Sequence, residues 1–244
     1  MIRRKGNPRV KRVLGLWLLC LCVAGSGLGL AQESRDRVLI KIFESDPEAK
    51  TTSYSLATNE LHIEPPSGYV ELIRDNTTLE AKQVDYAQES QVAVLQRDVK
   101  VTDPEIDLWT DKLTVQFNDD LYIAEGKVRL MQWEVDAQGE RGAQELYLTA
   151  DKVTINDAAK TVQAQGRVYV EEADRRVWSE TMDYDQQREI MVFTGDVRME
   201  TESGNRLQGN RVVVDLATDE VTVFGPVTGE FILETEEEAE PVGD

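Results

Sequence analysis

The sequence predicts an all-β domain in which repeated pairs of strands form two facing antiparallel sheets. Three observations predict it: apolar and polar residues alternate with a period of two, turn residues separate the alternating runs, and one pattern recurs five times. The clearest copy runs from Leu148 to Val170, with a polar turn at residues 156–160. No stretch carries a convincing helical period, so we expect little helix.

The five copies share one register over their first 21 positions. Position 19 is glycine in every copy but the first, which has Arg97 there, and position 21 is always valine. Successive copies start 29, 40, 29 and 30 residues apart, which is typical of repeats that bury their apolar faces only by stacking on neighbours. The copies begin at Leu79, Leu108, Leu148, Val177 and Leu207.

The second strand of each copy predicts the residues of the interior, because side chains of equal parity share one face of a strand. This parity assigns to the inner face Val99, Val101, Ala124, Val128, Leu130, Val162, Ala164, Val168, Val170, Met191, Phe193, Val197, Met199, Val221, Val223 and Val227. Glycine within a strand marks a bend, so we expect the ribbon to fold over itself at Gly126, Gly166, Gly195 and Gly225. Because the first copy has Arg97 in place of this glycine, the sequence does not decide whether that copy bends. In the first strands the parity shifts near Asp151–Lys152, which predicts a bulge or a corner.

The first 31 residues have the pattern of a cleaved signal peptide. A basic segment is followed by 11 apolar residues, Leu14–Ala24, and by the small-x-small sequence Gly29-Leu30-Ala31. A spanning helix needs about 20 apolar residues, and glycines interrupt the run before that length. We therefore expect export and cleavage before Gln32. Both cysteines, Cys20 and Cys22, lie in this segment, so the remaining chain needs no disulfide.

The charge of the chain argues against nucleic acid and anionic membrane surfaces as partners. The full sequence has 27 Lys+Arg against 46 Asp+Glu, and the predicted signal carries six of the cations and none of the acids. Cleavage thus leaves 21 cations and a net charge of −25. Outward-facing acidic side chains also keep the strands of a β protein solvated and discourage association of sheet edges.

The segments outside the five copies have simpler interpretations. Residues 32–78 fit the repeat poorly and are expected to be a degenerate first unit that caps the stack, with strands at Val38–Ile42 and Tyr69–Ile73. The long step between the second and third copies predicts an insertion at a hairpin tip, within Trp133–Glu145. Residues 79–234 are the five repeats, and the acidic tail 235–244 is expected to be disordered.

The residue types needed for catalysis or metal binding are nearly missing. His62 is the single histidine, no Gly-x-Ser-x-Gly elbow occurs, and no thiol remains after cleavage. His62 is therefore interpreted as an ordinary residue at a strand end. Asp183 and Asp185 share a face and allow calcium, but Asp185, like Asn156 and Asp215, stands where a turn is expected. We predict no enzyme activity, no cofactor and no metal.

The repeated Leu-x-Ala-Asp/Lys, Tyr/Ile-Asp/Asn and Gly-x-Val-x-Val pattern, five times in register behind a signal peptide, resembles the LptA/OstA-like family. The resemblance covers residues 79–234, with 32–78 as a degenerate start. It implies a β-jellyroll with an open apolar groove that binds lipid through the inner-face residues above. It also implies periplasmic transport of lipopolysaccharide, or a related lipid, between inner-membrane LptC-like and outer-membrane LptD-like jellyroll domains.

Two other classes of function remain open on the sequence. A membrane-anchored sibling resembling LptC would keep residues 14–30 as its anchor, whereas a secreted structural or adhesive repeat protein would have a filled core and no lipid. Exposed strand edges predict head-to-tail self-association, with Val38–Ile42 and Phe231–Leu233 as the candidate edges.

Overall fold

Sixteen antiparallel strands form one continuous curled sheet in the computed structural model, which describes residues 38–232 except 75, 137 and 173. The described residues contain no helix, and thus none long and apolar enough to cross a membrane. The predicted all-β fold class is therefore confirmed. The strands are β1 (Leu39–Phe43), β2 (Thr52–Ser55), β3 (Glu60–Ile63), β4 (Tyr69–Arg74), β5 (Thr77–Ala81), β6 (Gln83–Ala87), β7 (Val92–Thr102), β8 (Ile106–Gln116), β9 (Leu121–Val135), β10 (Arg141–Asn156), β11 (Thr161–Glu172), β12 (Arg175–Asp185), β13 (Ile190–Thr201), β14 (Arg206–Asp215), β15 (Glu220–Phe224) and β16 (Thr228–Glu230).

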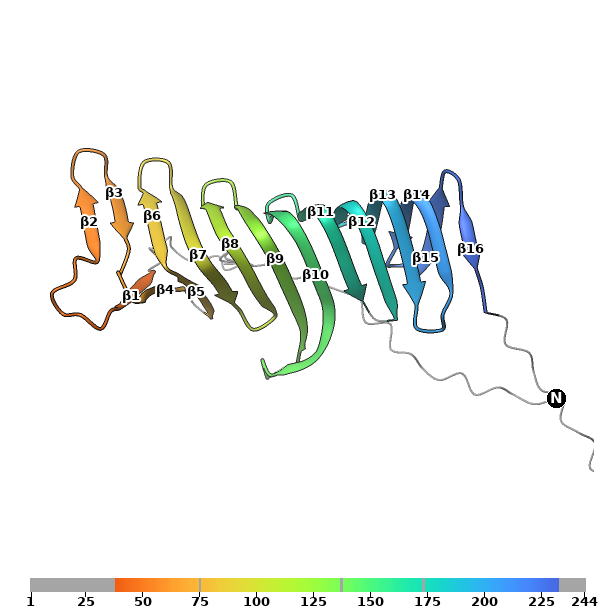
Figure 1. Cartoon of the computed structure of the whole chain (residues 1–244), viewed down its shortest axis with the longest axis horizontal. Helices are drawn as coiled ribbons and strands as arrows, with labels where there is room; N and C mark the ends of the chain where they lie inside the picture. Colours follow the sequence, from red (N-terminus) through yellow and green to blue (C-terminus); the bar gives the residue numbers. More distant parts are fainter. Residues whose placement is uncertain (1–37, 75, 137, 173, 233–244) are drawn as a thin grey trace, which may run out of the picture.

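The long strands β7 to β14 each bend in the middle, so the sheet has two halves that share them. The first half-sheet begins with β2, β3 and β6, continues through one end of each long strand, and finishes at β15. The second half-sheet begins with β1, β4 and β5, continues through the other ends, and finishes at β16. Figure 1 shows the long strands β7 to β14 side by side in chain order along the long axis.

In β7, β9, β11 and β13 the bends are β-bulges at which two consecutive residues have positive φ. In β11, Gly166 (φ 76°) and Arg167 (φ 47°) lie where the pairing with β12 shifts register between Gln165 and Val168. Gly126–Lys127 and Gly195–Asp196 have the same geometry. A bulge increases twist and bends the strand, which turns a flat ribbon into two facing halves. The irregularity predicted near Asp151–Lys152 is also observed, as a register shift between Thr149 and Lys152.

The first and last copies differ from the others at this bend. In β7 the bulge is present despite the missing glycine, with Arg97 at φ 65° and Asp98 at φ 54°. In the last copy Gly225 has φ 93°, but the strand is interrupted and resumes as β16. Pro226 occupies the second bulge position, and proline cannot adopt the positive φ that this position has in the other copies.

The hairpin turns of the first half-sheet, along the top of Figure 1, repeat one design. Asn156 Oδ1 accepts a hydrogen bond from the backbone N–H of Ala159, and the Oδ1 atoms of Asp185 and Asp215 accept from Arg188 and Thr218. Side chains of Asn and Asp that cap their own turn in this way are Asx turns. These observations agree with the turn interpretation of the three residues.

The insertion lengthens one hairpin of the second half-sheet. β9 and β10 pair as far as Val135 and Arg141, around the turn at residues 136–140. This hairpin extends past its neighbours at the lower edge of Figure 1. Arg141 donates to both carboxylate oxygens of Asp107 on β8, at 2.7 and 3.0 Å, and holds the extension against the sheet.

Candidate functional site

The interior between the two half-sheets collects most residues that the sequence assigned to it. Thirteen of the sixteen are at most 6% exposed and belong to one continuous apolar cluster. Phe193, Val168 and Val197 are among the most deeply buried, at 1%, 1% and 0%. The other ten are Val99, Val101, Ala124, Val128, Leu130, Val162, Ala164, Val170, Met191 and Met199.

The last copy departs from this pattern. Val221 and Val223 are only partly buried against the cluster, and Val227 is 52% exposed. The expectation that Val227 lies inside is therefore wrong. Pro226 prevents the bulge that aims the equivalent valines inward, and no further strand of the described chain covers β15 or β16.

The interior is filled by its own side chains in this conformation. Residues from both half-sheets pack in the same cluster, for example Ala164 and Val153 from the first and Val170 and Leu148 from the second. Exposures of a few per cent mean that solvent does not reach these side chains. The expected open groove is therefore a closed apolar layer here, and a guest molecule enters it only if the half-sheets separate.

A polar rim lines the lateral mouth, which is the side of the curled sheet opposite the bulges, where hairpin turns of the two half-sheets face each other. Gln132, Glu172 and Arg175 continue the inner-face parity of the second half-sheet, and Tyr184 lies on the inner face of the first. Gln132, Glu172 and Tyr184 are 3%, 7% and 2% exposed. The sequence prediction kept only apolar positions, although the alternation of Val168 and Val170 leads directly to Glu172.

One ion pair crosses this mouth. Arg175 at the start of β12 in the second half-sheet places Nη2 3.0 Å from Oδ1 of Asp219, in the β14–β15 turn of the first. The Arg175 side chain is 15% exposed and that of Asp219 is 78% exposed. Buried polar atoms nearby are left without hydrogen bonds among the described residues: Nε of Arg175 and the hydroxyl of Tyr184.

Burial also shifts the pKa values of side chains in the rim. Desolvation raises the pKa of Glu172, the nearby Arg175 opposes this effect, and the Asp219 carboxylate adds to it. Desolvation raises the pKa of Tyr184 to about 12, with a further contribution from the charge of Glu172. The four side chains therefore interact as one cluster between the two half-sheets.

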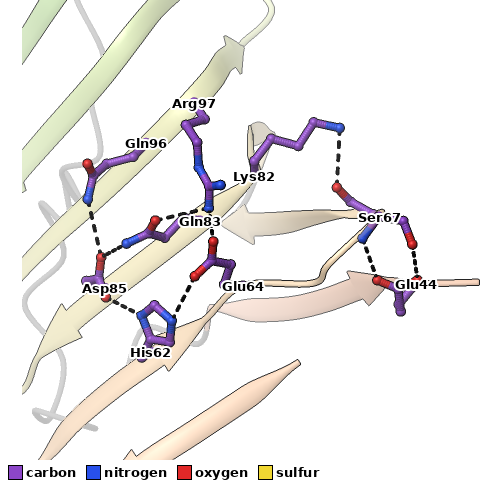
Figure 2. A network of polar contacts seen from close by, with 10 residues as sticks. Glu44, His62, Glu64, Ser67, Lys82, Gln83, Asp85, Gln96 and Arg97 are labelled. Atoms are coloured by element: carbon purple, nitrogen blue, oxygen red, sulfur yellow. Dashed lines mark hydrogen bonds and ion pairs between the residues drawn. The ribbon is translucent and has the colours of Figure 1, made fainter. Parts of the chain in front are cut away.

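A second polar network lies on the outer face of the first half-sheet, near the N-terminal end (Figure 2). His62 Nδ1 on β3 is 2.5 Å from Asp85 Oδ1 on β6, and its Nε2 is 3.4 Å from Glu64 Oε2. Arg97 at the β7 bulge binds both Glu64 and Gln83. His62 thus lies near the end of β3, in agreement with the sequence, and in addition ties β3 to β6.

The geometry offers no grouping suited to catalysis within the described part of the chain. The ion-pair partners of His62 are carboxylates, and no cluster of three or more His, Cys, Asp or Glu side chains among residues 38–232, outside the three gaps, could hold a metal. Asp183, one of the two calcium candidates, accepts a hydrogen bond from Gln163 Nε2 instead. The predicted signal peptide and tail lie outside the described residues.

Comparison with solved structures finds LptH of Pseudomonas aeruginosa, described as the LptA-homologous periplasmic component of the lipopolysaccharide transport device. The TM-score is 0.44 at 16% identity, and the match covers 52% of this chain and 95% of LptH. No curated protein matches the sequence. The family described as "LptA/(LptD N-terminal domain) LPS transport protein" matches residues 48–220, well over half of the 244-residue chain. The curled sheet with its repeated bulges thus belongs to a member of the LptA/LptD N-terminal domain family of lipopolysaccharide transport proteins.

Proposed function

We propose that this protein is a periplasmic bridge that passes lipopolysaccharide, or a related lipid, from the inner to the outer membrane through the interior of its curled sheet. The observation that carries the proposal is the apolar stripe on the inner face, which continues from unit to unit along the sheet. Membership of a lipopolysaccharide transport family supports lipopolysaccharide as the transported molecule. The sheet supplies a path for the lipid, and transport along it is proposed without a reaction, cofactor or metal.

The free energy of burying acyl chains in the interior allows a lipid to pass through but does not drive it in one direction. Each methylene of an acyl chain gains about 0.8 kcal/mol on leaving water for an apolar environment. Both membranes offer nearly the same gain, so an apolar path between them removes the barrier of crossing water and leaves no net drive. Direction must come from an energy-consuming partner, in keeping with a chain that has no nucleotide-binding motif.

The two ends of the sheet are the natural places for such partners. Within the part of the chain that the structure describes, β1 pairs only with β4, and β2 only with β3, while β15 and β16 at the other end pair only with β14. Unpaired edges accept a strand from another chain. We infer LptC-like and LptD-like jellyroll domains, or further copies of this protein, as the docking partners. Export by a cleaved signal peptide would place the protein where these partners meet.

The proposal is tested by photo-crosslinking in cells at matched inward and outward positions. A crosslinking residue at Val168 or Phe193, both 1% exposed, should capture lipid during transport. The same residue at Arg167 or Arg198, which face outward, should capture none. A secreted structural protein with a permanently filled core would give no adduct at any of the four positions, and equal labelling at all four would mean nonspecific contact.

A second measurement separates a bridge from a membrane-anchored sibling. N-terminal sequencing of the exported protein is expected to begin at Gln32. A product that keeps Met1 and fractionates with membranes would favour the anchored form.

A further inference from the structure

An ion pair crosses the lateral mouth and joins side chains of very different exposure. Arg175 is held at the rim, with 15% of its side chain exposed, whereas Asp219 projects from a turn with 78% exposed. Exposed ion pairs contribute little to stability, because solvent competes for the charges. The Arg175–Asp219 pair can therefore close the mouth and still be exchanged.

Arg175 has binding capacity that the protein does not use. Its buried Nε makes no hydrogen bond among the described residues and lies 3.8 Å from Asp174 Oδ1. Guanidinium donates two parallel hydrogen bonds to phosphate or carboxylate, which fits an anion better than the one-atom contact with Asp219. A phosphate at the mouth would occupy both Nε and Nη2.

The surroundings of Arg175 favour such an exchange. Glu172, its neighbour across the β11–β12 pair, has a raised pKa because it is desolvated, so it is more readily neutral than a free glutamate. The buried hydroxyl of Tyr184, which makes no hydrogen bond among the described residues, lies in the same cluster and is a second donor for an incoming oxygen. Directly behind this rim lie Val170 and Val177, which begin the apolar interior.

We propose that Arg175 and Asp219 form a latch across the lateral mouth, and that the anionic headgroup of an amphipathic lipid opens it by replacing Asp219 on Arg175. The acyl chains then enter the interior sideways, between the separated half-sheets, while the headgroup stays at the rim. This inference rests on the proposed function, since it assumes that the interior accepts acyl chains. It adds a residue that selects the lipid and a place where the lipid enters.

The latch is tested with a cleavable cross-link. A bis-methanethiosulfonate reagent joins cysteines at positions 175 and 219, because two cysteines without a linker are too short to replace the contact that the long Arg175 side chain makes with Asp219. In the full chain, Cys20→Ser and Cys22→Ser leave no native thiol, and Arg175→Cys with Asp219→Cys adds a pair across the mouth. Entry of the neutral dye N-phenyl-1-naphthylamine is followed by its fluorescence. The cross-link should slow entry at least about tenfold relative to the same protein without it, a difference of about 1.4 kcal/mol, and a reductant should restore the fast entry of the variant without the cross-link, which lacks the ion pair and should take up dye faster than the wild type.

Single variants test the role of charge. Asp219→Asn removes one charge from an exposed side chain and should speed dye entry severalfold with an unchanged circular dichroism spectrum. Glu200→Gln, which removes one partner of Arg206 in an outer-face ion pair of the second half-sheet, is the matched control and should change nothing. Dodecyl phosphate should displace the dye about tenfold better than dodecyl maltoside in the wild type, and Arg175→Gln should abolish that preference.

The outcomes distinguish failure of the latch from failure of the transport proposal. If the dye enters the cross-linked double-cysteine protein as fast as the same protein after reduction, or if Arg175→Gln keeps the preference for dodecyl phosphate, the latch is refuted and an apolar path remains. If no variant takes up dye, including reduced and Asp219→Asn protein, the interior is a permanent core and both proposals fall.

Discussion

At the scale of single residues, the bulge glycines bear the strongest constraint. A Cβ added to Gly166 would lie 2.5 Å from Oδ2 and 2.9 Å from Cβ of Asp151, at a φ of 76° that other residues adopt at a penalty of about 1 to 2 kcal/mol. We expect Gly166→Ala to lower the free energy of unfolding by about 2 kcal/mol or more, measured by urea denaturation. Gly139→Ala is the control, because Gly139 has φ 83° but open space around it. The decrease in its free energy of unfolding should therefore come from backbone conformation alone.

The first bulge allows the opposite change. Arg97 holds φ 65° without the benefit of glycine, and its side chain, 53% exposed, binds Glu64, which directly follows β3. Arg97→Ala and Arg97→Gly both remove that ion pair, but only glycine relieves the backbone. The glycine variant should therefore be more stable than the alanine variant by about 1 kcal/mol. Equal stabilities would show that the bulge of β7 is not strained by its side chain.

At the scale of elements, His62 couples the pairing of β3 and β6 to pH. The hydrogen bond to Asp85 raises the pKa of His62 above its usual 6.5, and the charge of Glu64 raises it further. Because folding raises the pKa, protonated His62 contributes its full stabilisation of the folded state below pH 6.5. This stabilisation disappears as the pH rises through the pKa that His62 has in the folded protein. The gain is limited to roughly 1 kcal/mol at most, since the side chain is 41% exposed.

This linkage predicts a pH profile for the N-terminal strands. Hydrogen exchange of β3 and β6 amides, corrected for the intrinsic rate, should show less protection at pH 8.5 than at pH 6. The difference should vanish in His62→Gln, which keeps a polar side chain without the titration. Amides of β12, far along the sheet, should respond equally in both proteins, and a wild-type difference that persists in His62→Gln would contradict the assignment.

The extent to which the sequence predicts these elements follows from what each element depends on. The alternation around Val168 and Phe193 depends only on burial of one strand face, so period and parity suffice to place those side chains inside. Tyr184 and Glu172 escape such a prediction, because their burial depends on the opposite half-sheet closing over them. The prediction that Val227 lies inside fails for a related reason. The last copy matches the others in sequence pattern, but Pro226 and the end of the sheet change the surroundings of Val227.

At the scale of the whole molecule, both ends of the sheet carry exposed apolar residues. At the N-terminal end these are Val38, Leu39, Ile40, Ile42, Phe43, Tyr54 and Leu56, and at the C-terminal end Phe224, Val227, Phe231 and Ile232. The predicted N-terminal edge, Val38–Ile42, is found as β1, whereas Phe231 and Ile232 lie outside any strand. The C-terminal edge is instead formed by β15 and β16.

These ends predict assembly in a line, because pairing of β15 or β16 with β1 or β2 of a second copy would continue both half-sheets and the apolar interior between them. Sedimentation velocity across a concentration series should show species larger than the monomer. Ile40→Pro in β1 or Thr222→Pro in β15 removes a backbone donor from an edge strand and should shift the distribution toward monomer with the β spectrum retained. Phe231→Pro, beyond the last strand, is the control and should leave association unchanged. A distribution that stays monomeric in the wild type at all concentrations would rule out self-pairing and leave the edges to other jellyroll domains.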